Sequence, residues 1–194
     1  MKQPNLLEVD WTRIPAPEND GAAAHLVGMA IPPLSLRATN DTSVVLSELK
    51  GRVVVFAYPR TGEPGKISLV DDWDMIPGAR GCTPQTCAFR DLFAELKAAG
   101  AAHVFGLSTQ SNDYQTEMAA RLHLPFPVLS DEALDLVHAL DLPIMEVADL
   151  TLIKRLALII DDAKITHVFY PVFPPDRNAS DVLAWLKANP ALNR

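Results

Sequence analysis

The sequence predicts an α/β domain with a mixed central β-sheet and helices packed against it. Short apolar runs rich in β-branched residues alternate with amphipathic segments between residues 53 and 140, as expected for strands and helices in turn. Two further apolar runs then follow with only a short turn between them, which indicates an antiparallel hairpin. At 194 residues and 48% apolar content, one domain of ordinary size accounts for the chain.

The chain begins with a stretch that has no periodic pattern. Residues 1–20 hold prolines and several charges, so we interpret them as an N-terminal arm. Trp11 is the residue expected to hold this arm in place. Residues 21–194 are then expected to form the single domain.

The first core strand is predicted at residues 53–58, an apolar and largely β-branched run that Pro59 ends. Residues 60–81 follow and contain four glycines and two prolines. This segment is long for a connection between elements, so we interpret it as an inserted loop that leads the chain to Cys82.

A helix is predicted to begin at Cys82 and to stop at Gly100, because glycine is a common helix terminator. Its apolar residues recur at the spacing i, i+3, i+4 and i+7, at Phe89, Leu92, Phe93 and Leu96.

The second half of the chain continues the alternation. The expected elements are a strand at 104–108, a helix capped by Ser111, a strand at 126–129, a helix capped by Ser130 that carries Leu134, Val137 and Leu140, strands at 156–160 and 165–170, and a helix after Ser180 that ends at Pro190. A β-α-β unit followed by a hairpin and a last helix around one sheet is the thioredoxin-like arrangement.

Cys82 and Cys87 are the only cysteines in the chain, and both lie where the inserted loop runs into the predicted helix. A thiol at a helix start faces the partial positive charge of unpaired backbone N–H groups, which favours the thiolate over the thiol. Cys82 is therefore the candidate nucleophile.

The spacing of the two cysteines argues against a structural disulfide. Residues five apart on an unbroken helix have Cα atoms roughly 8.6 Å apart, whereas a disulfide needs about 4.4–6.8 Å. The two sulfurs cannot bond unless this turn unwinds. The pair is therefore either two independent thiols or a redox couple that moves.

Several segments of the chain resemble the peroxiredoxin Q or bacterioferritin-comigratory branch of the peroxiredoxins. The matching segments are residues 53–59, 81–91, 106–109, 127–132 and 155–161, in family order. Together they extend over roughly residues 26–188, and the segment with both cysteines is a fairly specific signal.

This resemblance implies a peroxiredoxin variant of the thioredoxin-like fold and a thiol peroxidase that needs no cofactor or metal. Cys82 matches the peroxidatic cysteine, Cys87 the resolving cysteine of the same chain, and Arg155 the arginine that holds the thiolate. Thioredoxin or a glutaredoxin-like dithiol is the implied reductant, and a peroxide the substrate. The residues expected to line the peroxide site are Pro59, Thr61, Gly81 and Thr83.

The chain departs from the family pattern just before the reactive cysteine. The family's threonine, three residues before that cysteine, falls at Ala79, and its proline, seven before, falls at Met75. Because Pro59 fits the end of the first strand, the simplest alignment inserts ~16 residues between Pro59 and Cys82. Thr61 or Thr83 then supplies the missing hydroxyl.

Composition and charge exclude other classes of partner. A formal net charge of −7 argues against a nucleic-acid-binding surface. The sequence has no apolar stretch long enough to span a bilayer and no secretion signal, so we expect a cytoplasmic protein without membrane contact, a monomer or a homodimer. The histidines have no metal-ligand spacing.

Two alternatives to a peroxidase remain open at the level of the sequence. A thioredoxin-type thiol-disulfide oxidoreductase uses two cysteines separated by two residues, and this chain has four between them. A non-catalytic redox-sensing domain of the same fold is the other alternative. Insulin reduction would support the first, and a reversible thiol change without peroxide turnover would support the second.

Overall fold

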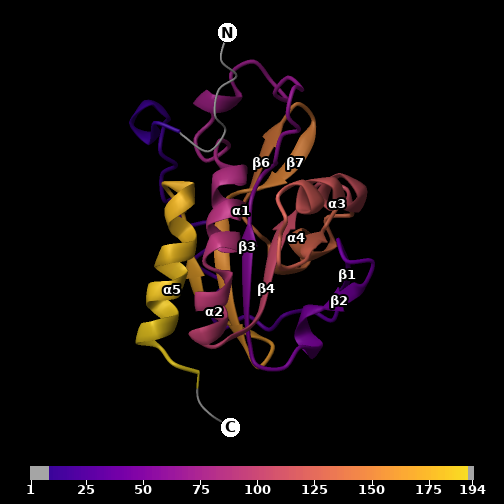
Figure 1. Ribbon diagram of the computed structural model, residues 1–194, viewed down its shortest axis with the longest axis vertical. Helices are drawn as coiled ribbons and strands as arrows, with labels where there is room; N and C mark the ends of the chain where they lie inside the picture. The colour runs from indigo at the N-terminus through magenta and orange to yellow at the C-terminus, as the bar shows by residue number, and fades with distance from the viewer. Residues whose placement is uncertain (1–8, 192–194) are drawn as a thin grey trace.

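The computed structural model describes residues 9–191, and its centre is a mixed sheet (Figure 1). Within these residues the sheet has seven strands in the order β2 (Ser43–Val45), β1 (Ser35–Ala38), β5 (Val128–Ser130), β4 (Ala101–Ser108), β3 (Arg52–Ala57), β8 (Leu156–Asp161) and β9 (Lys164–Phe169). β3 runs parallel to β4 and antiparallel to β8, and β4 runs parallel to β5. The predicted mixed sheet is confirmed.

The strand β3 lies inside the sheet between β4 and β8, and all of its residues are buried. Val53 and Val55 pack on one face, whereas Val54 and Phe56 pack on the other. This alternation is expected for a strand covered on both sides, and it explains why the sequence at 53–58 is continuously apolar.

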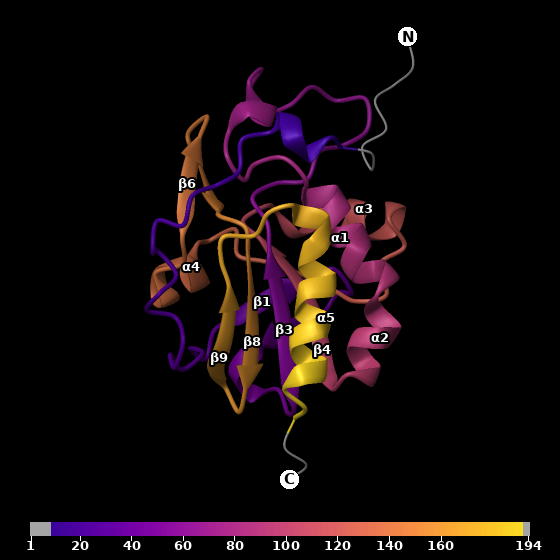
Figure 2. The same cartoon turned by 90° about the vertical axis from the view of Figure 1, so that its left-hand side faces the viewer.

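Helices cover both faces of the sheet. The α-helices are α1 (Cys82–Asp91), α2 (Phe93–Ala98), α3 (Asn112–Arg121), α4 (Asp135–Leu140) and α5 (Asn178–Ala188). Figure 2 shows α1, α2, α3 and α5 on one side of the sheet and α4 on the other. Within residues 9–191 no helix is long and apolar enough to cross a membrane.

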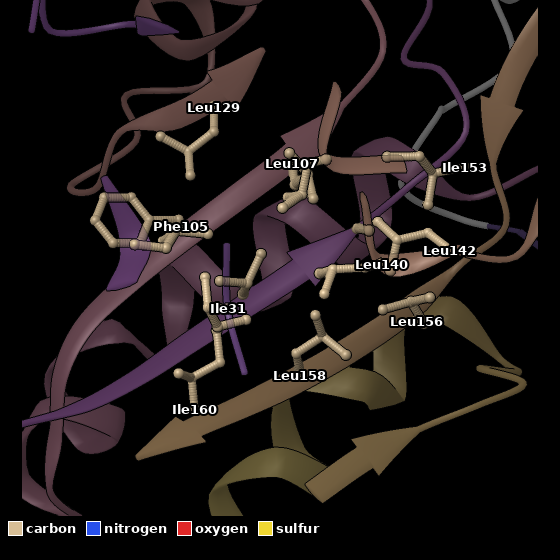
Figure 3. Packing of buried hydrophobic residues seen from close by; sticks show 14 of the residues in the cluster. Ile31, Phe105, Leu107, Leu129, Leu140, Leu142, Ile153, Leu156, Leu158 and Ile160 are labelled. Carbon is tan, nitrogen blue, oxygen red and sulfur yellow. The ribbon is translucent and has the colours of Figure 1, made fainter. Parts of the chain in front are cut away.

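Each face of the sheet has its own apolar core. On the side of α4, side chains from β3, β4, β5 and β8 meet Ile31, Leu140 and Leu142 (Figure 3). On the other side, Phe56 stacks on Phe89 of α1 with ring centroids 4.0 Å apart. Burial of each large apolar side chain contributes roughly 1.5–3 kcal/mol to stability. Such contacts are therefore the main interaction that holds α1 against the sheet.

The predicted hairpin at the end of the sheet is confirmed as β8 and β9. The turn between them is made by Asp162 and Ala163, which have φ values of 48° and 59°. Two successive residues with positive φ match the right-handed twist of a two-residue hairpin.

The helix predicted from Cys82 to Gly100 is instead two helices. Leu92 has φ −98° and ψ 9°, so α1 ends there and α2 begins at the next residue. The apolar spacing continues unchanged through Leu92, and for this reason the sequence pattern contains no signal of the break.

One predicted helix cap and one predicted helix start are wrong. Ser130 donates its hydroxyl to the carbonyl of Gln110, and the carboxylate of Asp131 accepts the N–H groups of Leu136 and Val137 instead. A carboxylate accepts two N–H groups at once, which a single hydroxyl does less well.

At the last helix, Ser180 lies inside α5 and donates to the carbonyl of Arg177, because the helix already begins at Asn178. The strand predicted at 126–129 starts at Val128, after Pro127, which has no N–H for the sheet. Ser111 does accept the N–H of Tyr114, so the cap predicted for α3 is confirmed.

Some elements were not predicted from the sequence. Besides β1 and β2, they include the hairpin of β6 (Ile144–Val147) and β7 (Leu150–Ile153) and the short 3-10 helices η1 (Trp11–Arg13), η2 (Leu46–Glu48), η3 (Trp73–Met75) and η4 (Pro175–Arg177). Residues 60–81 include η3, and Trp73 and Ala79 of this segment pack against Val147 and Leu152 of the hairpin. The inserted loop therefore has an apolar anchor of its own.

Candidate active site

The candidate site lies at the end of the sheet where β3 stops and β8 starts. Ala57, the last residue of β3, is paired with Leu156, the first residue of β8. Because the two strands are antiparallel, Arg155 before β8 lies at the same end as the chain leaving β3. The inserted loop returns to this end and delivers Cys82 there as the first residue of α1.

Cys82 is 3% exposed, and its sulfur has two polar neighbours. Arg155 Nη2 donates to Cys82 Sγ at 3.2 Å, and Sγ donates to the carbonyl of Ala79 at 3.5 Å. The N-cap of α1 is Gly81 in the left-handed conformation, with φ 105°. A guanidinium and a helix start thus face the same sulfur.

Arg155 is 2% exposed and is fixed on several sides. The carbonyls of Gly78, Ala79 and Arg80 lie 3.1–3.3 Å from its Nη2 and share the two N–H groups of this nitrogen with Cys82 Sγ. Its Nη1 donates to Gln85 Oε1. Within residues 9–191 its Nε is buried without a hydrogen-bond partner. The fork of the guanidinium is therefore held in position by the loop before Cys82 and by α1.

Gln85 connects this site to the last helix. It lies one turn after Cys82, and its Nε2 donates to Asn178 Oδ1 at 2.9 Å while its Oε1 accepts from Arg155. Both Gln85 and Asn178 are buried. A change at the start of α1 would therefore disturb Arg155 and the start of α5 together.

Cys87 lies on the same helix and is 5% exposed. Burial raises the pKa of its thiol above the ordinary value of 9.0, and the nearby Arg90 lowers the pKa by less than burial raises it. Cys87 is therefore a neutral thiol near pH 7. Because α1 is unbroken from Cys82 to Asp91, the two sulfurs are not in bonding reach in this conformation.

A cavity of about 410 Å³ opens beside Cys82. The predicted site residues Thr61, Gly81 and Thr83 line it, together with Arg60 and other residues of the inserted loop, Trp73 and Tyr114. Pro59 is buried and is not among the lining residues. Of the four residues expected at the peroxide site, the structure thus brings three to the cavity.

Comparison with known proteins agrees with this geometry. Residues 26–186 match the model of the Redoxin family. The chain belongs to the Redoxin family. Its curated relatives include peroxiredoxin Q of Oryza sativa subsp. japonica, 32% identical over 83% of this chain and 66% of the relative, and peroxiredoxin Q of Sedum lineare, 32% identical over 83% of this chain and 77% of the relative, both chloroplastic. The chain thus spans just under two thirds of the rice relative.

A solved structure extends the comparison to the fold. Peroxidoxin BcpB of Mycobacterium tuberculosis is 27% identical, with a TM-score of 0.67 over 84% of this chain and 97% of that one. The predicted peroxiredoxin variant of the thioredoxin-like fold is confirmed, as is the resemblance to the peroxiredoxin Q and Bcp branch.

The hydroxyl that replaces the family threonine in this peroxiredoxin remains a prediction, but the structure bears on the choice. Thr61 donates its hydroxyl to Gln110 Oε1 at 3.1 Å, and its N–H donates to the same oxygen at 2.8 Å. Its hydroxyl proton is therefore not available to a bound peroxide in this conformation. Thr83 lines the cavity one residue after Cys82 and is half-buried.

Residues that the sequence analysis missed complete the site of the peroxiredoxin. Gln85 stands three residues after Cys82 on the same face of a predicted helix, and that spacing was a usable signal. Asn178 had no such signal, since it is 93 residues from Gln85. Tyr58 donates its hydroxyl to Gln115 Oε1 at 2.9 Å. Burial is the main cause that raises the pKa of the Tyr58 phenol, and the charge of Cys82 is the second.

Proposed function

We propose that this peroxiredoxin reduces hydrogen peroxide and organic hydroperoxides, with Cys82 as the peroxidatic and Cys87 as the resolving cysteine. The observation that carries the proposal is the 3.2 Å contact between Arg155 Nη2 and Cys82 Sγ at the start of α1. Because an arginine stays protonated at every pH at which proteins work, this contact stabilises a sulfur anion more than a thiol.

In the first step the Cys82 thiolate attacks one oxygen of the peroxide, and the O–O bond breaks. The sulfur is oxidised to a sulfenic acid, and the other oxygen takes up a proton and leaves as water or an alcohol. Arg155 Nη2 lies beside the sulfur, where it is close to the charge that develops on the leaving oxygen. The cavity beside Cys82 gives the peroxide its access.

In the second step the Cys87 thiol condenses with the sulfenic acid, which forms the disulfide and releases water. This step requires the first turn of α1 to open, since the Cα atoms of the pair are roughly 8.6 Å apart on a regular helix. The first backbone hydrogen bond of α1 joins the N–H of Gln85 to the carbonyl of Gly81, so few such bonds hold the turn of Cys82. Opening also returns Cys87 to water, where its thiol ionises more readily than in the closed helix.

An external dithiol then restores both thiols by exchange and becomes a disulfide itself. We infer thioredoxin or a glutaredoxin-like protein as this reductant. A cytoplasmic location and a monomeric or homodimeric state are part of the same proposal. A reducing compartment keeps Cys82 and Cys87 as thiols between turnovers.

The test counts thiols after one equivalent of hydrogen peroxide. Two thiols should disappear in the wild type, and none in Cys82→Ser. In Cys87→Ser the Cys82 thiol alone should disappear, and turnover with thioredoxin, thioredoxin reductase and NADPH should stop. A normal steady-state rate in Cys87→Ser would remove Cys87 from its role. Reduction of insulin disulfides without peroxide consumption would favour a thioredoxin-type oxidoreductase instead.

A further inference from the structure

Trp11 lies against the start of α1, although it is far from this helix in the sequence. Its Nε1–H donates to Asp176 at 2.9 Å, and its ring meets Phe173 edge to face with centroids 6.1 Å apart. These two residues belong to the segment around η4, just before α5. In Figure 2 the indigo arm passes above the ends of α1 and α5.

The contact of Trp11 with α1 is at Gly81, the N-cap. A Cβ added to Gly81 would lie 2.7 Å from Trp11 Cη2 and 2.6 Å from Pro175 Cγ. The indole and the proline ring are therefore packed directly onto the Gly81 backbone, closer than any residue with a side chain permits. The arm and η4 together cover the first residue of the turn that holds Cys82.

This is the same turn that must open for the Cys82–Cys87 disulfide to form. Opening moves Gly81 and Cys82 away from the core and breaks the tie from Gln85 to Asn178. It also requires Gly81 to leave the surface formed by Trp11 and Pro175. The packing of Trp11 on Gly81 therefore stabilises the closed turn.

We propose that Trp11 is a positioning residue that holds the first turn of α1 closed and so slows disulfide formation after Cys82 has been oxidised. This inference rests on the proposed function. The Cys82 sulfenic acid then persists longer and meets one of two fates. It condenses with Cys87 and releases water, or it reacts with a second peroxide to give a sulfinic acid and one more water or alcohol.

Trp11 is well suited to such a role, because neither apolar core of the sheet includes it. None of the residues of η1 is fully buried, and the hydrogen bond from Trp11 to Asp176 is exposed. Removal of the indole thus leaves both apolar cores of the sheet unchanged. The effect of the substitution should appear in the opening of α1 and not in the folding of the domain.

The experiment compares Trp11→Ala with the wild type and with Arg13→Ala, an exposed residue of the same 3-10 helix. After mixing with hydrogen peroxide, samples are quenched with a thiol-blocking reagent at increasing times, and mass spectrometry measures the disulfide and the Cys82 sulfinic acid. We expect disulfide formation about tenfold faster in Trp11→Ala, since an aromatic packing contact and one hydrogen bond are lost. We also expect less sulfinic acid at excess peroxide. Arg13→Ala should match the wild type.

A second variant keeps the inference falsifiable if Trp11→Ala does not fold. Trp11→Phe retains a ring and loses the N–H donor, so an intermediate rate is expected. Unchanged disulfide rates and unchanged sulfinic fractions in both variants, with Cys82 still oxidised, would overturn the role of the arm. Failure of Cys82 to form a sulfenic acid in Cys87→Ser would instead overturn the proposed function, so the two failures are distinguishable.

Discussion

Cys82 and Cys87 lie on the same helix, five residues apart and almost equally buried, at 3% and 5% exposure. Their surroundings nevertheless differ. Cys82 is at the helix start, beside a cavity and within 3.2 Å of the Arg155 guanidinium. Cys87 is in the middle of the helix, where burial raises the pKa of its thiol. Exposure therefore does not distinguish the two cysteines; the charge and the helix position beside each sulfur do.

The largest effect is expected when the guanidinium beside Cys82 is removed. Arg155→Leu should slow the oxidation of Cys82 by about a hundredfold or more, the usual effect of losing one donor to a developing anion. Arg155→Lys keeps the charge but loses the two-pronged guanidinium, so its rate of Cys82 oxidation should lie between those of the wild type and of Arg155→Leu. Stopped-flow measurement of peroxide consumption in a Cys87→Ser background checks this. A rate equal to that with Arg155 present would contradict the role of the arginine.

A smaller effect is expected from Gln85, which holds Arg155 in place without touching the sulfur. Gln85→Leu should slow the oxidation of Cys82 about tenfold, because one hydrogen bond to a charged group is lost and the carbonyls before Cys82 still hold the guanidinium. Gln85→Glu retains the acceptor and should preserve most of the rate. Equal rates for Gln85→Leu and Gln85→Glu would contradict the role of Gln85 in positioning Arg155. Disulfide formation should be faster in Gln85→Leu, because the tie to Asn178 is also lost.

The smallest effect concerns Cys87 and pH. Its pKa is raised in the folded chain, so the folded state keeps this proton above pH 9.0, where an opened or unfolded chain releases it. The contribution of the neutral Cys87 thiol to the free energy of unfolding is thus fully present below pH 9.0, and it is lost as pH rises through the pKa of the folded state. Urea unfolding of the wild type between pH 7 and 10 should show a small decrease in stability at the alkaline end. The decrease should be weaker in Cys87→Ala, and an identical pH profile for both would show that Cys87 is not the source.

The sequence predicted the central parts of the fold because local patterns and tertiary packing agree there. The buried run at 53–58, the cap at Ser111 and the hairpin ending at Phe169 each have a local signal. The strands of the hairpin at 144–153 and those near 35–45 are only three or four residues long, so an alternation such as that of Ser35–Ala38 is too short to identify a strand. They form because neighbouring strands supply the pairing.

The candidate site was predictable to a different extent for each residue. Cys82 follows from its chemistry and its place at a helix start. Arg155, 73 residues away, came from resemblance to a family, because nothing in its local sequence indicates that it is buried. The contacts of Gln85 with Asn178 and of Trp11 with Gly81 join distant segments, and a single sequence contains no signal for them.

The pairing of β3 with β8 has a consequence for how this site tolerates change. The pairing places Arg155 at the end of β3, and the carbonyls of Gly78, Ala79 and Arg80 hold its guanidinium beside the sulfur, whereas the rest of residues 60–81 leaves the end of the sheet and comes back to it. At one end this excursion is fastened to Gln110 through Thr61, and near the other it is fastened to the β6–β7 hairpin through Ala79. Lengthening or trimming the stretch between these two fastenings alters the entrance that an oxidant passes while the reacting pair stays in place. The middle of the inserted loop thus shapes the entrance to the cavity, while the last residues of the loop hold the guanidinium.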